Sequence, residues 1–144
     1  LQEHNADPHR LTVELTETTM VSGSAIADQN IGAIRAAGVS LAIDDFGTGY
    51  ASLSYLQRMD VSEIKIDHSF VAGLQKTDRN ESEELIGAIV ALARGLGLSV
   101  VAEGVETPEQ AAWLRDVGCD LIQGRLVGRP VGPEAFARDY AGQA

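Results

Sequence analysis

Positive charge is scarce in this sequence: its 144 residues include 11 Lys and Arg against 21 Asp and Glu, a formal net charge of −10 at pH 7. Nucleic acids and anionic membranes are bound through fields of Lys and Arg, so this deficit argues against both as partners. The single cysteine, Cys119, cannot form an internal disulfide. No apolar run approaches the roughly 18 residues that cross a membrane, and the N-terminus lacks the features of a signal peptide. These absences predict a cytoplasmic protein, and the missing initiating methionine predicts a chain that begins inside a longer gene product.

The composition is that of a folded domain, with 44% apolar and 22% charged residues over a length typical of one domain. Five short aliphatic runs are expected to form strands: Leu11–Leu15, Val39–Ile43, Glu63–Ile66, Leu98–Ala102 and Leu121–Gln123. Segments of helical periodicity separate or follow them: Ser24–Ala37, Ser52–Met59, Glu81–Leu96 and Pro133–Tyr140. Because no hairpin signal joins any two strands, this alternation predicts an α/β fold of parallel βα units.

One further helix has a strong local start signal. Thr107 is expected as its N-cap, Pro108 as its first residue, and Gln110 stands three positions after the cap, which is the spacing of a capping box. Gly118 is expected to end this helix.

Acidic and amide residues fall at the ends of the predicted strands. They are Glu14, Glu17, Asp44, Asp45, Asp67, Glu103, Glu106 and Gln123. In parallel α/β folds the carboxyl edge of the sheet carries ligands and catalysts. A single acid there would more often cap a helix or face water, but so many carboxylates would repel one another without a cation. All-oxygen ligand sets suit Mg²⁺ or Mn²⁺ better than zinc.

The adjacent Asp44 and Asp45 can serve one site only where the strand ends or twists, because neighbouring strand residues point to opposite faces. Gly47 and Gly49 are expected to supply that freedom. Lys65, one βα unit later and flanked by isoleucines in a strand that should be buried, is expected to offset the carboxylate charge and to hold an anionic oxygen or an attacking water.

Five motifs together resemble the EAL-domain family of bacterial cyclic di-GMP phosphodiesterases over nearly the whole chain. They are Glu14-Leu-Thr-Glu17, Asp44-Asp-Phe-Gly-Thr-Gly-Tyr-Ala-Ser-Leu53, Ile64-Lys-Ile-Asp67, Val101-Ala-Glu-Gly-Val-Glu-Thr107 and Gln123-Gly124. The resemblance implies a (β/α)8 TIM-type barrel. Such barrels take about 250 residues, so residues 1–144 are expected to be the C-terminal part of one barrel domain that lacks its first strands.

The resemblance also implies roles for the acids and the lysine. Glu14 and Asp44 resemble ligands of a first metal ion, with Asp44 shared and Asp45 on a second ion. Glu103 resembles a ligand or water-orienting base, and Lys65 the residue that positions the attacking water. Three others resemble partners of substrate or of ordered water: Asp67, Glu106 and Gln123.

Glu17 resembles the family's tether for a regulatory loop that includes Phe46, Gly47, Thr48 and Gly49. That loop is expected to couple dimerisation to metal and substrate binding. The implied reaction is hydrolysis of cyclic di-GMP to linear pGpG with two Mg²⁺ or Mn²⁺ ions. The implied partners are a second copy in a homodimer and N-terminal sensory or GGDEF-type domains in the parent protein.

The sequence departs from the family pattern in two places. The Glu-Ala-Leu motif and an asparagine ligand are absent, so the 144-residue chain alone is expected to bind Mg²⁺ poorly and to hydrolyse cyclic di-GMP negligibly. Arg125 stands where the family usually has an aromatic residue, and Val127 where phenylalanine is common.

Two other functions fit parts of the pattern. A catalytically inactive EAL domain would act as a cyclic di-GMP sensor or a protein-interaction module, although every acid of the motifs is present. A response-regulator receiver would share the length, the acidity, the Asp pair and a lysine. In a receiver, however, the lysine ends the fifth strand, whereas Lys65 follows the Asp pair by one βα unit.

Overall fold

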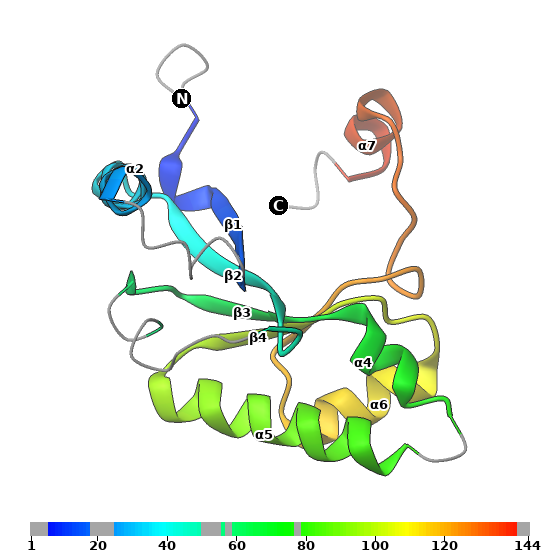
Figure 1. Ribbon diagram of the computed structural model, residues 1–144. Helices are drawn as coiled ribbons and strands as arrows, with labels where there is room; N and C mark the ends of the chain where they lie inside the picture. Colours follow the sequence, from blue (N-terminus) through cyan, green and yellow to red (C-terminus); the bar gives the residue numbers. More distant parts are fainter. Residues whose placement is uncertain (1–5, 18–24, 50–55, 57–58, 77–78, 141–144) are drawn as a thin grey trace.

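A computed structural model describes residues 6–17, 25–49, 56, 59–76 and 79–140 (Figure 1). Its strands form one all-parallel sheet in the order of the sequence. They are β1 (Thr12–Thr16), β2 (Ser40–Phe46), β3 (Glu63–Ile66), β4 (Ser99–Ala102) and β5 (Leu121–Ile122). A doubly wound sheet reverses its strand order at a switch point, whereas a barrel does not. The order therefore confirms an α/β fold of the TIM-barrel type, and the five strands form an incomplete barrel.

Helices follow or separate these strands. They are α2 (Ala25–Ala36), α4 (His68–Gly73), α5 (Asn80–Leu96), α6 (Pro108–Val117) and α7 (Pro133–Tyr140), with a short 3₁₀ turn η2 (Pro8–Arg10) before β1. Helix α5 packs against β3 and β4, whereas α7 lies apart at the end of a long segment after β5 (Figure 1). No helix among the described ranges is long and apolar enough to cross a membrane.

The predicted elements are found close to their expected bounds, with two differences. Strand β2 continues three residues beyond Ile43, and α4 was not expected. Helix α4 has six residues, too few for a helical period to be visible, and its start depends on a local cap: the Asp67 carboxylate accepts the Ser69 N–H at 3.0 Å. The predicted helix Ser52–Met59 lies mostly outside the described residues.

The core lies between the sheet and its helices. Its fully buried large side chains are Leu41, Ile43, Ile64, Ile66, Val71, Ile86, Val100, Val105 and Leu114. Strands of a parallel sheet are covered on both faces, so they are expected to be continuously apolar. Polar residues inside or directly after such strands are therefore surrounded by tightly packed apolar side chains.

The start of α6 confirms the predicted capping box. Thr107 Oγ1 accepts the Gln110 N–H at 3.3 Å, and Gln110 Oε1 accepts the Thr107 N–H at 3.0 Å. Gln110 is buried and also donates through Nε2 to the Val71 carbonyl of α4 at 3.0 Å. Gly118 ends the helix with φ of +97°. The cap therefore fixes α6 against α4, and it also holds the segment directly after β4.

Replacing Thr107 with alanine should lower the free energy of unfolding by about 1 kcal/mol, because the Gln110 N–H loses its acceptor. Urea titration followed by circular dichroism measures this change. Thr107→Ser keeps the hydroxyl and should lose much less. Equal losses in the two variants would mean that the methyl group, and not the cap, supplies the stability.

Candidate active site

A bulge in β2 brings the two adjacent aspartates to one side of the sheet. Ile43 pairs with Ile64 and Phe46 with Ile66, so three steps along β2 match two along β3. Asp45 adopts a φ of +55°, which short polar residues such as aspartate tolerate better than most. Carboxylate oxygens of Asp44, Asp45 and Glu103 consequently lie within 4.8 Å of one another. The freedom expected of Gly47 and Gly49 is therefore supplied at Asp45 itself and at Gly47, two residues later, which has a φ of +97°.

Lys65 is enclosed by three carboxylates from three strands or their ends. Its Nζ atom lies 2.6 Å from Glu14 Oε1, 2.6 Å from Glu103 Oε1 and 3.1 Å from Asp44 Oδ1. The residue is 4% exposed, because β3 lies between β2 and β4 in the sheet. The parallel pairing of the strands therefore brings residues that are far apart in the sequence into one compact ionic cluster.

The protonated form of Lys65 is strongly favoured over the neutral amine. Burial by itself would lower the pKa of the ammonium group, but the contacts with Glu103, Glu14 and Asp44 raise it well above the usual value. Lys65 is thus fully protonated at neutral pH. It can donate hydrogen bonds and neutralise negative charge, but it cannot take a proton from water.

Asp44 carries the feature that best fits a metal ion. Its Oδ1 atom is buried, and its contact among the described residues is the ion pair with Lys65 Nζ at 3.1 Å. One ammonium group shared among three carboxylates neutralises only part of their charge, which leaves Asp44 able to bind a further cation. Together with the oxygens of Asp45 and Glu103, it forms the hard ligand set that Mg²⁺ and Mn²⁺ prefer.

Asp45 and Asp67 interact with each other, and their pKa values are shifted in opposite directions. Desolvation and the charges of Asp44 and Asp67 raise the pKa of Asp45. Burial would also raise the pKa of Asp67, but hydrogen bonds from Ser69 and the neighbouring His68 lower it. His68 Nδ1 lies 2.9 Å from Asp67 Oδ2. Asp67 therefore holds the start of α4 as a carboxylate, while Asp45 gains from any cation placed beside it.

Glu17 fixes the turn that follows β2. This buried side chain accepts the N–H groups of Gly47 at 3.2 Å and of Gly49 at 3.0 Å through Oε2. Thr48 Oγ1 donates to the Asp45 carbonyl at 2.8 Å, and Phe46 is buried. The acid at the end of β1 is thus connected through this turn to the backbone of a candidate metal ligand.

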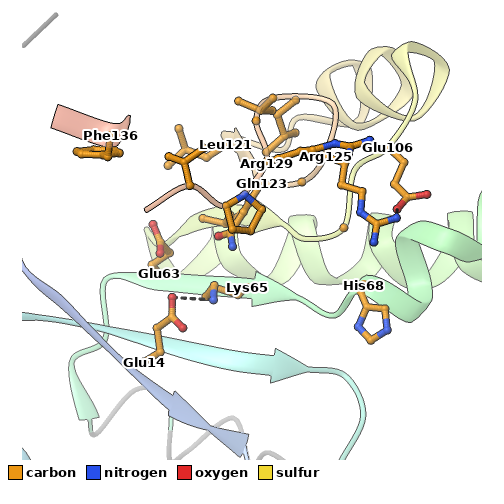
Figure 2. Close-up of a pocket in the computed structure, with 18 residues that line it drawn as sticks. Glu14, Glu63, Lys65, His68, Glu106, Leu121, Gln123, Arg125, Arg129 and Phe136 are labelled. Carbon is orange, nitrogen blue, oxygen red and sulfur yellow. Dashed lines mark hydrogen bonds and ion pairs between the residues drawn. The ribbon is translucent and has the colours of Figure 1, made fainter. Parts of the chain in front are cut away.

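A cavity of about 1030 Å³ opens over Glu14 and Lys65 (Figure 2), whereas Asp44, Asp45 and Glu103 are not among the described residues that line it. Glu14 and Lys65 line its floor, Gln123 lies above Lys65, and Arg125 and Glu106 form one end of it. Arg125 Nη1 donates to Glu106 Oε1 at 3.2 Å. Pockets of this size accommodate small organic molecules and cofactors.

The structure brings most of the candidate residues to the same edge of the sheet. Lys65 contacts Glu14, Asp44 and Glu103. Asp44 and Glu103 also form a cluster with Asp45, and Glu14 does not belong to that cluster. Several other residues of the pocket were not predicted from the sequence to belong to the site, among them Glu63, His68, Arg129 and Phe136. Of these, only His68 carried a signal, since it directly follows the Ile64-Lys-Ile-Asp67 motif.

Comparison with known proteins gives the same assignment as the motifs. The model of the EAL domain matches residues 1–130. The bifunctional diguanylate cyclase/cyclic di-GMP phosphodiesterase MucR of Pseudomonas aeruginosa is 42% identical over 141 residues, which are 98% of this chain and 20% of MucR. The chain therefore spans about a fifth of that relative.

Two solved structures have the same fold as this chain. The structure described as PaMucR phosphodiesterase in complex with c-di-GMP is 42% identical with a TM-score of 0.87, covering 94% of this chain and 54% of that one. A manganese/cy-diGMP complex of Klebsiella pneumoniae BlrP1 is 38% identical with a TM-score of 0.80, covering 90% of this chain and 33% of that one. The chain belongs to the EAL domain family.

Proposed function

We propose that this chain supplies the metal-binding and catalytic edge of a cyclic di-GMP phosphodiesterase, which hydrolyses the cyclic dinucleotide to linear pGpG. The observation that carries the proposal is the cluster of Asp44, Asp45 and Glu103 beside the enclosed Lys65. Relatives named as cyclic di-GMP phosphodiesterases support the substrate, and the calcium and manganese complexes of BlrP1 support divalent ions as cofactors.

In this proposal two Mg²⁺ or Mn²⁺ ions would lower the pKa of the attacking water and offset part of the negative charge on the phosphate group. Asp44, Asp45 and Glu103 would hold them, with Glu14 as a further ligand. The water oxygen forms a bond to phosphorus, the bond between phosphorus and the 3′ oxygen breaks, and that oxygen leaves with a proton.

Lys65 acts in this reaction as a fixed cation. Its ammonium group is fully protonated, so it orients the water and stabilises negative oxygen through donated hydrogen bonds. In the structure the contacts of Nζ are with carboxylates. Lys65 therefore becomes available to water or phosphate when cations take over part of the carboxylate charge. Glu103, which touches Lys65, is placed to accept a hydrogen bond from the same water.

The remaining expectations belong to the same proposal. Residues 1–144 act as the C-terminal part of one barrel domain in a cytoplasmic protein, as a homodimer and together with N-terminal sensory or GGDEF-type domains. The combination of a cyclase and a phosphodiesterase in the name of MucR supports such an arrangement.

A hydrolysis assay tests the proposal. Purified chain is incubated with cyclic di-GMP and Mn²⁺ or Mg²⁺, and pGpG is quantified by liquid chromatography. Because the chain covers 54% of the MucR phosphodiesterase structure, the 144 residues alone should produce negligible pGpG, and a longer polypeptide that completes the barrel should produce it efficiently. Glu103→Gln should abolish product in both. A parent polypeptide that binds cyclic di-GMP without hydrolysing it would support the sensor function instead.

A further inference from the structure

We propose that Arg125 is a specificity-determining residue that reads a guanine base of the substrate, an inference that rests on the proposed function. Arg125 lies in the same cavity as Lys65 and Glu14, at the end formed with Glu106 (Figure 2). Its side chain is 74% exposed, so a ligand in the cavity can reach it.

The backbone that carries Arg125 is fixed by close packing. Gly124 has a φ of +158°, and a Cβ atom there would lie 2.2 Å from the Val105 carbonyl oxygen. The Val105 N–H donates to the Gln123 carbonyl at 3.0 Å, and the Leu126 N–H donates to the Val105 carbonyl at 3.1 Å. The turn that begins at Gly124 therefore rests on the segment after β4, directly beside the metal-binding residues.

The guanidinium group of Arg125 is oriented by a hydrogen bond to Glu106. Arg125 Nη1 donates to Glu106 Oε1, and the Glu106 N–H donates to Oε1 of the buried Gln110 at 2.8 Å. Glu106 is thus held by the capped start of α6. No other described residue accepts a hydrogen bond from Arg125, so its remaining N–H groups are available to a ligand.

The exposed ion pair between Arg125 and Glu106 contributes little to the stability of the fold, so stability alone does not explain why Arg125 lies there. Its chemistry fits a purine edge. Arginine donates two parallel hydrogen bonds to O6 and N7 of guanine, whereas adenine presents an amino donor in place of O6. A phosphate would also accept from Arg125, but it would not distinguish the two bases.

The test compares cyclic di-GMP with cyclic di-AMP, which share the ring and both phosphates and differ in their bases. Dissociation constants are measured by ligand-observed NMR for the unaltered chain and for Arg125→Ala, Arg125→Lys and the control Arg129→Ala. Arg129 lines the same cavity and has no partner among the described residues. We expect Arg125→Ala and Arg125→Lys to weaken cyclic di-GMP binding about 10-fold or more, with cyclic di-AMP unchanged. Arg129→Ala should leave the preference between the two intact.

Each other outcome contradicts the inference in a recognisable way. If Arg125→Ala weakens both nucleotides equally, or if Arg125→Lys restores binding, the residue acts through charge on phosphate. If the preference for cyclic di-GMP survives Arg125→Ala, another residue reads the base and the proposed function still stands. If the unaltered chain binds neither nucleotide, these residues do not form a base-reading site and the inference fails, whereas the hydrolysis assay decides the proposed function separately. Thermal unfolding of Arg125→Ala should match the unaltered chain, which separates a binding effect from misfolding.

Discussion

Without divalent ions, the Lys65→Met variant should be less stable than the unaltered chain by about 3 kcal/mol in its free energy of unfolding. Methionine fills a similar volume, so the variant removes mainly the positive charge. Glu14, Asp44 and Glu103 are then left close together without the ammonium group that now lies 2.6–3.1 Å from each of them. The expected loss is at the low end for a broken buried ion pair, because the Glu14 side chain is half exposed.

Urea titrations in a chelating buffer and in Mn²⁺ measure this loss. The ion should restore much of the stability, since it replaces the missing positive charge beside the same carboxylates. Arg35→Met is the matched control: Arg35 pairs with Asp60 at the opposite end of the sheet, and both side chains are exposed. That variant should lose less than about 1 kcal/mol and should not respond to Mn²⁺. Equal losses at Lys65 and Arg35 would mean that the enclosed cluster has no special electrostatic role.

Much of the fold could be predicted because its signals are local and repeated. The strand Glu63–Ile66 and the helix Pro133–Tyr140 have their predicted bounds, and the cap at Thr107 is formed by the residues that its spacing indicated. Helix α4 was missed because it is shorter than two turns and its start depends on one side-chain hydrogen bond from Asp67. Strand β2 was predicted too short because an Asp pair normally ends a strand, whereas here the bulge lets the strand continue to Phe46.

The candidate site could be predicted in its members but not in its grouping. Acids at the ends of parallel strands had to meet at one edge of the sheet. Which carboxylates share a cation depends on the bulge at Asp45 and on the lateral position of β3, and neither is encoded in a local pattern. The structure separates Glu14, which contacts Lys65, from the three carboxylates that cluster with one another. The pairing of Arg125 with Glu106 likewise depends on how the turn after β5 packs on Val105.

Loss of divalent-ion binding is the largest effect that we expect from a single change, and Asp44→Asn should produce it. The variant removes one charge from the three-carboxylate cluster at a partly buried side chain that shares the Lys65 ammonium group with two other carboxylates. Changing an outer partner of a metal ligand already costs about 10–100-fold in affinity, so changing a ligand itself should cost at least about 100-fold. The side chain keeps its size, so the fold should be preserved.

Substoichiometric Mn²⁺ measures this effect even when binding is weak, because a bound paramagnetic ion broadens nearby amide signals in NMR spectra. In the unaltered chain the signals of Phe46 and Gly104, which adjoin the cluster in sequence, should broaden first. Asp116→Asn is the control, since Asp116 lies on α6 with a 75% exposed side chain and should not alter the pattern. Unchanged broadening in Asp44→Asn would contradict an ion at this cluster. Broadening lost in Asp44→Asn but kept in Asp116→Asn would place the ion where the bulge in β2 gathers the carboxylates.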